Sequence, residues 1–259
     1  MHDVAAMIPV LLGSTRVPDK NIILVDGKIL CVYTIDACKA SGVFKSIHLN
    51  SEDDVFRSIA EQEGVLFHER PPEWGGRACS QKTKSRDCAG SRCVINEHYL
   101  YQFMTSGTNA EYVCQVNSTS PLLNPETIKS FVYTLQQGDY DSLFSTHDIR
   151  AESFYQGSPV SFSRKYKLPS NELEPISTVC WAIAGWRRQA FIDAYSRDEP
   201  NQDGPAFVGK LGLFPIDERE ALDIDHWSAL EVAEQFLVAR RMNAVRSWSY
   251  IDGRTITGQ

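Results

Sequence analysis

The chain has 259 residues, of which 42% are hydrophobic and 23% are charged, so it is long and apolar enough to bury a core as one large domain. The formal net charge of -7 argues against a broad nucleic-acid surface, although a local basic pocket for a small anion is compatible with it. No apolar run approaches the roughly 20 residues of a membrane span, and the N-terminus shows no signal-peptide pattern. The seven cysteines have no regular spacing, which is typical of free thiols in a cytoplasmic protein.

The first strand and the loop after it form the strongest local feature. Residues 4–12 are an apolar run, typical of a buried strand, and the run ends at a glycine. The polar loop that follows offers close backbone approach, hydroxyls, positive charge and an amide, from Gly13, Ser14, Thr15, Arg16, Lys20 and Asn21. Such a loop commonly holds nucleotide phosphates, whereas the plainer interpretation is an ordinary strand-to-helix turn. The loop has neither the Gly-Lys-Ser/Thr of a Walker loop nor the further glycines of a dinucleotide fingerprint.

The next segments alternate between helical and strand patterns. Apolar residues at helical spacing predict a helix over 28–41, and a strand follows at 46–50. Residues 51–54 cap a second predicted helix that runs to 63, and another strand follows at 65–68. This alternation predicts a mostly parallel sheet with helices on its faces.

Residues 69–92 interrupt the alternation. They open with Arg70-Pro71-Pro72 and carry many positive charges, from Arg77, Lys82, Lys84, Arg86 and Arg92. In an acidic chain, such a loop is either an anion-binding lid or a plain surface loop. The soft metal ligands of this region match no common zinc-site spacing, so free thiols are the simpler interpretation for Cys79, Cys88 and Cys93 near His98.

The second half of the chain predicts the remaining elements. We expect a helix over 93–105, a strand over 111–117, a loop over 118–123, a helix capped by Asn124 and running to 137, and a strand over 142–146. From 148 to 174 the signal weakens, and short pieces at 160–162 and 166–168 suggest β hairpins in an excursion from the main sheet. A strand over 178–184, a helix over 187–195, a strand over 210–215 and a closing helix over 225–240 complete the prediction.

The sharpest acidic feature is Leu222-Asp223-Ile224-Asp225. Alternate residues of an extended segment point the same way, so both carboxylates can face one site while the apolar residues face the core. Two carboxylates beside a phosphate loop suit Mg²⁺, which prefers oxygen ligands and bridges them to phosphates. The alternative is that Asp225 only caps the last helix and Asp223 is solvated.

Taken in order, these motifs resemble those of the acylneuraminate cytidylyltransferase family, the CMP-sialic acid synthetases and their relatives. The family opens with Ile-Ile-Pro-Ala-Arg-x-Gly-Ser-x-x-Ile-Pro-x-Lys-Asn, which is matched here by Ile8, Pro9, Gly13, Ser14, Pro18, Lys20 and Asn21. Its later motifs Ser-Thr-Asp-Asp, Arg-Pro, Gln-Pro-Thr-Ser-Pro-Leu-Arg and Ile-Asp-Ile-Asp resemble the segments 50–54, 70–71, 117–123 and 222–225, and its Ala-Glu resembles 233–234. The matches follow the family's order and cover most of residues 4–240.

The resemblance implies a fold and an activity. The implied fold is a Rossmann-like three-layer α/β/α nucleotidyltransferase with a mostly parallel sheet, in one domain over residues 1–259 with a dimerisation excursion at about 148–177. The implied reaction joins CTP to a 2-keto sugar acid of the sialic, legionaminic, pseudaminic or Kdo type and releases a CMP-sugar and pyrophosphate. The resemblance also implies a Mg²⁺ cofactor and a homodimer.

The resemblance also assigns roles to individual residues. Gly13, Ser14, Thr15, Arg16 and Lys20 would hold the triphosphate, and Asn21, Arg70 and Asn117, together with Thr119 and Ser120, would bind the cytidine side of the nucleotide. Asp223 and Asp225 would bind Mg²⁺, and Arg16, Lys20 and Asp225 would act on the reacting phosphate.

Two family arginines are absent from this chain. They fall on Leu11 and Leu123, and leucine cannot supply the charge-assisted hydrogen bonds of an arginine beside a triphosphate. Cations of the basic loop could replace them, namely Arg77, Lys82, Lys84 or Arg86. The acceptor acid therefore stays open, and so do two other interpretations: a nucleotidyltransferase for a different nucleotide or acceptor, such as a phosphonate, and a non-catalytic nucleotide-binding relative.

Overall fold

The computed structural model describes residues 2–14, 16–72, 95–197, 204–242, 247–249 and 255–257. Thr15 and the predicted basic loop beyond Pro72, with its three cysteines, lie outside the described residues. Predictions that concern them therefore stay predictions.

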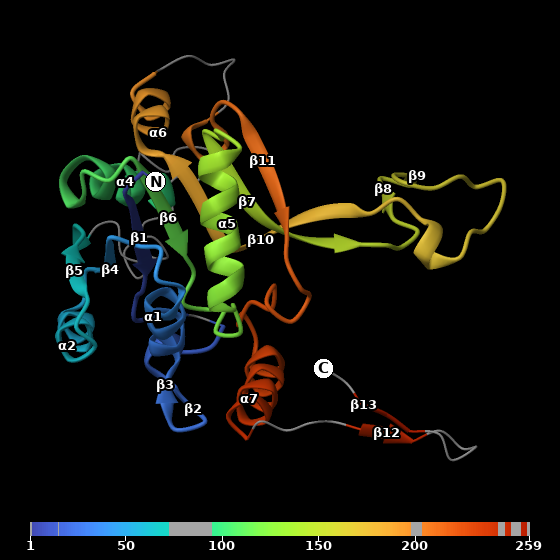
Figure 1. The fold of residues 1–259 in the computed structure, drawn as a ribbon, viewed down its shortest axis with the longest axis horizontal. Helices are drawn as coiled ribbons and strands as arrows, with labels where there is room; N and C mark the ends of the chain where they lie inside the picture. The colour runs from blue at the N-terminus through green and yellow to red at the C-terminus, as the bar shows by residue number, and fades with distance from the viewer. Residues whose placement is uncertain are drawn as a thin grey trace.

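A seven-stranded sheet in the order β11-β7-β10-β6-β1-β4-β5 forms the centre of the molecule (Figure 1). Its strands are β1 (Val4–Pro9), β4 (Ser46–Ser51), β5 (Leu66–Glu69), β6 (Tyr112–Val116), β7 (Ser142–Ile149), β10 (Ile176–Arg187) and β11 (Leu211–Pro215). β1 pairs in parallel with β4 and β6, β4 with β5, and β7 with β11. β10 is antiparallel to both of its neighbours, β6 and β7, so the predicted mostly parallel sheet is confirmed.

Helices cover both faces of this sheet. α1 (Leu30–Ser41), α2 (Asp54–Gln62) and α5 (Pro125–Gln137) pack on one face through the largest cluster of buried apolar side chains. α4 (Ile95–Gln102), α6 (Arg188–Tyr195) and the short helical turns η4 (Phe103–Gly107) and η6 (Pro205–Phe207) pack on the other face. The expected three-layer α/β/α arrangement is therefore confirmed.

Helix α5 shows how the sequence determines a boundary. The Asn124 side chain accepts a hydrogen bond of 3.0 Å from the backbone N–H of Glu126, Pro125 occupies the first helical position, and Gly138 follows the last turn. Four buried apolar residues then line the face toward the sheet: Ile128, Phe131, Val132 and Leu135. The helix spans the residues that these signals predict.

The helix predicted from residue 28 begins two residues later, because Lys28–Ile29 forms a strand instead. This strand, β3, pairs with β2 (Leu24–Val25). The turn between them, Asp26-Gly27, has positive φ at both residues (46° and 78°), which is typical of a tight two-residue hairpin. The loop after β1 contains one more short turn, η1 (Lys20–Ile22).

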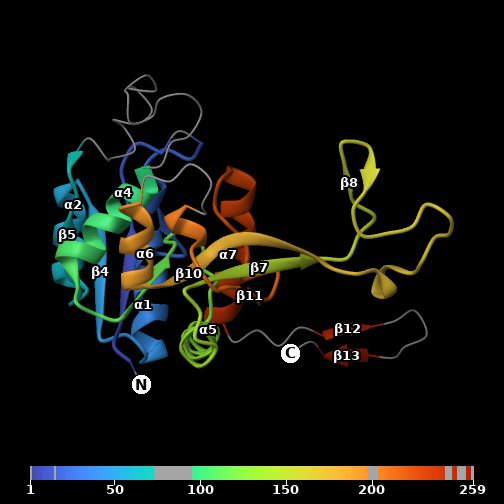
Figure 2. The ribbon, with the colours of Figure 1, turned by 90° about the horizontal axis from the view of Figure 1, so that it is seen from above.

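Strands β7 and β10 continue past the body of the sheet and carry an arm that projects from the molecule (Figures 1 and 2). The arm contains the hairpin β8 (Phe154–Tyr155) and β9 (Ser158–Pro159), followed by η5 (Ser170–Glu172). The predicted excursion is therefore present, but strands at 160–162 and 166–168 are wrong. The hairpin forms earlier because Gln156 and Gly157 both have positive φ and make its turn.

The closing helix, α7 (Trp227–Arg241), is followed by two strands that we did not predict, β12 (Ser247–Ser249) and β13 (Thr255–Thr257), which pair antiparallel. The sequence between them contains Asp252-Gly253, a dipeptide that favours hairpin turns and therefore carries a signal for this pairing. Within the described residues, no helix is both long enough and apolar enough to cross a membrane.

Candidate nucleotide site

The candidate site lies where the parallel strands β1, β4 and β6 end. Pro9 pairs with Asn50 at the ends of β1 and β4, and the Ser118 hydroxyl after β6 lies 3.2 Å from the carbonyl oxygen of Pro9. The loops that follow these strands are therefore neighbours, although they are far apart in the sequence. In open α/β sheets, ligands bind at this edge.

The loop after β1 is held by carboxylates. The backbone N–H of Leu12 donates to Asp53 at 3.0 Å, and the N–H of Gly13 donates to Asp19 at 2.6 Å. Gly13 has a φ of 83°, a conformation that favours glycine, and Asp19 adopts the left-handed region with a φ of 48°. The loop N–H groups therefore bind anionic oxygens, which is the property that a phosphate-binding loop needs.

The predicted acidic and basic residues meet at Asp225. Its Oδ1 lies 3.0 Å from Nζ of Lys20 and 2.7 Å from the guanidinium of Arg16. Nζ of Lys20 also donates to the carbonyl oxygen of Ile224 at 2.6 Å, across 204 residues of sequence. Three residues that we predicted for phosphate chemistry are therefore in direct contact.

The two aspartates of this segment have opposite pKa shifts. Burial raises the pKa of Asp223, the neighbouring Asp225 charge adds to the rise, and a hydrogen bond with Thr119 and the charge of Lys20 oppose it. Partial burial also acts to raise the pKa of Asp225, but the hydrogen bond and charge of Lys20, with the charge of Arg16, outweigh it and lower that pKa. Asp225 is therefore the stronger anion of the pair.

Asp223 and Asp225 fit a divalent cation. Oδ1 of Asp223 is buried and has no hydrogen-bond partner within the described residues, so an oxygen with lone pairs is left uncompensated. The pair interacts directly, and Ile224 between them is fully buried, as the alternation predicted. The N-cap of α7 is His226, which excludes the interpretation of Asp225 as the helix cap.

Backbone contacts connect this acidic segment to the loop after β6. The N–H of Ile224 donates to the carbonyl oxygen of Thr119 at 2.9 Å. Ser118, which sequence reasoning did not select, donates to the side-chain amide oxygen of Asn21 at 2.7 Å. Asn21 in turn donates to the carbonyl oxygen of Leu11 at 3.0 Å. Ser120 is 1% exposed, and its hydroxyl has no partner in the described part of the chain.

Arg70 lies within the wall of the site. It is 1% exposed and donates to Glu52 at 2.6 Å, to the carbonyl oxygen of Val10 at 2.8 Å and to Asn50 at 3.3 Å. Its guanidinium also lies 5.1 Å from the ring centre of Tyr99. In this conformation Arg70 joins the ends of β1 and β4, and a direct contact between Arg70 and a nucleotide stays a prediction.

The two leucines at the positions of the family arginines differ in their surroundings. Leu123 is 2% exposed and belongs to the core cluster of the α1 and α5 face, where an unpaired charge would be costly. Leu11 is half-buried in the loop after β1. The described residues that supply positive charge to the site are thus Arg16 and Lys20, with Arg70 in its wall.

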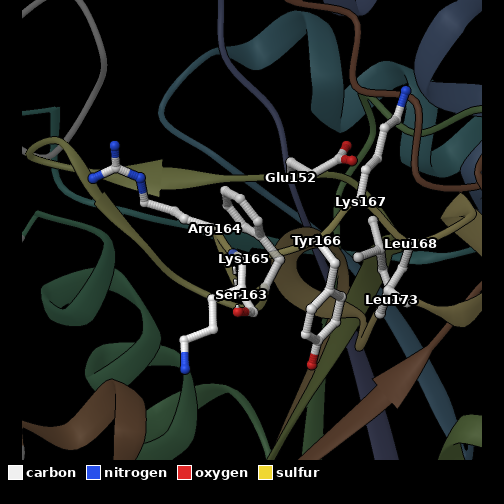
Figure 3. Close-up of a pocket in the computed structure, with 9 residues that line it drawn as sticks. Glu152, Ser163, Arg164, Lys165, Tyr166, Lys167, Leu168 and Leu173 are labelled. Atoms are coloured by element: carbon white, nitrogen blue, oxygen red, sulfur yellow. Dashed lines mark hydrogen bonds between the residues drawn. The ribbon is translucent and has the colours of Figure 1, made fainter.

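The arm contains a hollow of its own, a cavity of about 340 Å³ lined by residues of the segment 162–168 together with Glu152 and Leu173. Figure 3 shows the charged ends of Arg164, Lys165 and Lys167 pointing in different directions around it. Because these cations do not converge, the cavity lacks the geometry of a site for one anion. No group of three or more histidine, cysteine, aspartate or glutamate side chains is arranged to hold a metal in the described regions.

Comparisons with known proteins find similarity to cytidylyltransferases. A family model described as cytidylyltransferase matches residues 5–76. N-acylneuraminate cytidylyltransferase A of Danio rerio is 27% identical over 161 residues, which cover 61% of this chain and 34% of that protein. Pseudaminic acid cytidylyltransferase of Campylobacter jejuni strain 81-176 is 29% identical over 235 residues, which cover 88% of this chain and 93% of that protein.

Solved structures support the fold. A CMP:2-keto-3-deoxy-manno-octonic acid synthetase complexed with CTP superposes with a TM-score of 0.65 at 13% identity, over 92% of this chain and 99% of that one. The 4-diphosphocytidyl-2C-methyl-D-erythritol synthase of Anaerococcus prevotii superposes with a TM-score of 0.60 at 12% identity over the same shares. At these identities the likeness concerns the fold alone. The chain spans about a third of the length of the Danio rerio relative and of its counterpart in Oncorhynchus mykiss.

Proposed function

We propose that this chain, a relative of the acylneuraminate cytidylyltransferases, joins CTP to a 2-keto sugar acid and releases a CMP-sugar and pyrophosphate. The contact of Asp225 with both Lys20 and Arg16, beside a loop whose N–H groups bind anionic oxygens, carries the proposal. The names of the relatives support the substrates, since they include N-acylneuraminate and pseudaminic acid cytidylyltransferases.

The loop after β1 would bind the triphosphate. Backbone N–H groups near Gly13 would donate to phosphate oxygens in place of the Asp19 and Asp53 carboxylates. Arg16 and Lys20 would turn from Asp225 toward the phosphates and stabilise the negative charge that grows on the bridging oxygen as the sugar hydroxyl attacks the α-phosphorus. Thr15 would join this set through its hydroxyl.

Asp223 and Asp225 would hold Mg²⁺. The orphaned Oδ1 of Asp223 and the anionic Asp225 supply the oxygen ligands that this cation prefers. When bound there, the cation would neutralise charge on the phosphates and align them for displacement. On the other side of the site, Asn21 and Asn117 would contact the cytidine, with Ser120 and Thr119 shaping the loop between them.

The arm supports a homodimer. Four of its apolar side chains are more than half exposed: Phe154 (58%), Tyr155 (70%), Val160 (55%) and Tyr166 (62%). Exposed aromatic side chains gathered on a projecting segment mark an interaction surface. We assign this surface to a second copy of the chain, with the arm segment at about 148–177 as the contact.

Pyrophosphate release tests the proposal. The wild-type chain is offered CTP and Mg²⁺ with sialic, legionaminic, pseudaminic and Kdo acids in turn, and we expect release with one of them. Asp225→Ala should lower this rate by at least about a hundredfold, because it removes a charge from the reacting phosphate site. Asp217→Ala is the matched control, since Asp217 is an aspartate of the same region that pairs with Arg219.

The same assay separates the alternatives. Pyrophosphate release with UTP, ATP or GTP, or with a phosphonate acceptor, would show that the chain uses a different nucleotide or acceptor. If no combination of nucleotide and acceptor releases pyrophosphate but CTP raises the thermal stability, the chain binds the nucleotide without catalysing a reaction.

A further inference from the structure

Gln115 is a buried amide near the carboxyl end of β6, the central strand of the sheet. It is 6% exposed and pairs in register with Met7 on one side and Ala184 on the other, both of which are core residues. Its Oε1 is buried without a partner in the described part of the chain. A methionine or leucine would fill this place at lower cost, because a buried amide with an unsatisfied group is destabilising.

The Gln115 side chain makes one hydrogen bond within the described residues, and that bond leads to the candidate site. Its Nε2 donates to Oδ1 of Asn117 at 2.9 Å. Asn117 is the first residue after β6, where the loops of the site meet. The hydrogen bond to Asn117 therefore gives the buried Gln115 amide a role, which packing alone does not.

The backbone of Asn117 is also held in place. Its N–H donates to the carbonyl oxygen of Ala182 at 3.0 Å, and its carbonyl oxygen accepts from the N–H of Ser120 at 3.1 Å. Ala182 belongs to an irregular stretch of β10 in which Trp181 has a φ of 59°. With its backbone and Oδ1 held, Asn117 has its Nδ2 group left to offer, and among the described residues that group makes no hydrogen bond.

We propose that Gln115 is a positioning residue that holds the Asn117 amide with its NH₂ group toward the base of the bound nucleotide. This inference rests on the proposed function and adds to it a source of base selection. Cytosine offers acceptors at O2 and N3, whereas uracil has a donor at N3. An NH₂ donor fixed on Asn117 therefore binds the N3 acceptor of cytosine and is opposed by the N3–H donor of uracil. An Asn117 amide that is free to rotate presents either its NH₂ group or its oxygen and loses this preference.

The test compares the affinities for CTP and UTP, measured by calorimetry with Mg²⁺, in wild type, Gln115→Met, Asn117→Ala and the double variant. Gln115→Met keeps the length and volume of the side chain without the amide. We expect it to reduce the CTP preference over UTP by about 2- to 12-fold, the usual range for one hydrogen bond. In the Asn117→Ala background, the same change should have no further effect on the preference.

Cys114→Ala is the matched control. Cys114 precedes Gln115 on the same central strand, is fully buried and belongs to the opposite face of the sheet. It should lower stability without changing the ratio of the two affinities. If Gln115→Met does not fold, Asn117→Ala alone must lose the preference, and the Gln115 side-chain amide protons, observed by NMR, must exchange faster in that variant.

Two results would overturn the proposal. One is an unchanged CTP preference in folded Gln115→Met, and the other is an equal loss of that preference when Gln115→Met is made in the wild-type and in the Asn117→Ala background. The proposed function fails in a different way, namely if the wild-type chain binds neither nucleotide. In that case the positioning role fails as well, because the site that it would serve does not bind a base.

Discussion

At the scale of single residues, the chain concentrates its buried polar groups where the parallel strands end. Arg70, Asn50 and Glu52 form one such group, and the partly buried contact of Lys20 with Asp225 lies at the same edge of the sheet. Buried charges are tolerated only when they are paired and hydrogen-bonded, so these residues restrain the loops around them. Three side-chain oxygens of the same region are buried without a hydrogen-bond partner among the described residues: Oδ1 of Asp223, Oε1 of Gln115 and Oγ of Ser120. Polar atoms that the fold itself leaves unsatisfied mark places where a ligand or a positioning role is expected.

Buried His48 should make the stability of the protein depend on pH. Burial, with a smaller effect of His68, lowers the pKa of His48 to about 4. The folded protein therefore binds this proton more weakly than the unfolded chain does, and the free energy of unfolding should decrease as the pH falls from about 6.5 toward 4, by up to about 3 kcal/mol for this one group.

Urea unfolding at pH 7.5, 6.0 and 5.0 checks this prediction. His48→Gln should reduce the pH dependence over that range, with the remainder due in part to the burial that lowers the pKa of His68, whereas His226→Gln, a change at an exposed histidine, should leave it as in wild type. A wild-type slope that persists in His48→Gln would assign the acid sensitivity to other groups.

At the scale of elements, a helix or strand is best determined where a local sequence signal coincides with a buried apolar face. Helix α5 has both. In β10, by contrast, the pairing with β7 changes register between Val179 and Ala184. β10 pairs with β7 in the body and again in the arm, so this one strand serves two surroundings. The irregular stretch lies where the arm leaves the body, which is where such a break is required.

The N-cap of α5 should contribute measurably to the stability of the protein. Asn124→Ala should lower the free energy of unfolding by about 1 kcal/mol, because the N–H of Glu126 loses its acceptor. Asn124→Asp keeps an acceptor at the same place and should retain most of the stability. Thermal and urea unfolding measure both variants, and equal losses in the two would show that the cap is not responsible.

At the scale of the whole molecule, the arm is the feature that a single copy leaves unexplained. Phe154, Tyr155 and Tyr166 of the arm are exposed, although the body of the sheet is well covered. The arm joins the body through strands β7 and β10 (Figures 1 and 2), and most of its residues from 150 to 175 are exposed. A second copy would cover this surface.

Replacing Phe154, Tyr155 and Tyr166 by serine should convert a dimer into a monomer, because the apolar area that drives association is removed. Light scattering after gel filtration measures the mass. Tyr133→Ser on α5 is the matched control, because Tyr133 is 59% exposed on the body. A monomeric wild type, or a dimer that survives the triple change, would contradict the assignment.

Local chemistry in the sequence was enough to predict much of the fold. Periodicity, caps and turn residues predicted the alternating strands and helices, and α5 matched to the residue because Asn124, Pro125 and Gly138 act within a few positions of themselves. The β2–β3 hairpin and the position of the β8–β9 turn were missed, although Asp26-Gly27 and Gln156-Gly157 carry the signal. β12 and β13 were missed in the same way.

The residues of the acidic pair and of the first loop were also visible in the sequence, since alternation and the order of motifs identify them without a structure. Their partners were not visible. The contacts of Lys20 with Asp225, of Leu12 with Asp53 and of Ser118 with Asn21 span 205, 41 and 97 residues. Contacts of this kind depend on which strands become neighbours, and the sheet order decides that. The chemical character of each segment can be read from its residues alone. Which of these residues meet in one site depends on the fold, because strand pairing brings side chains that are distant in the sequence within hydrogen-bonding distance.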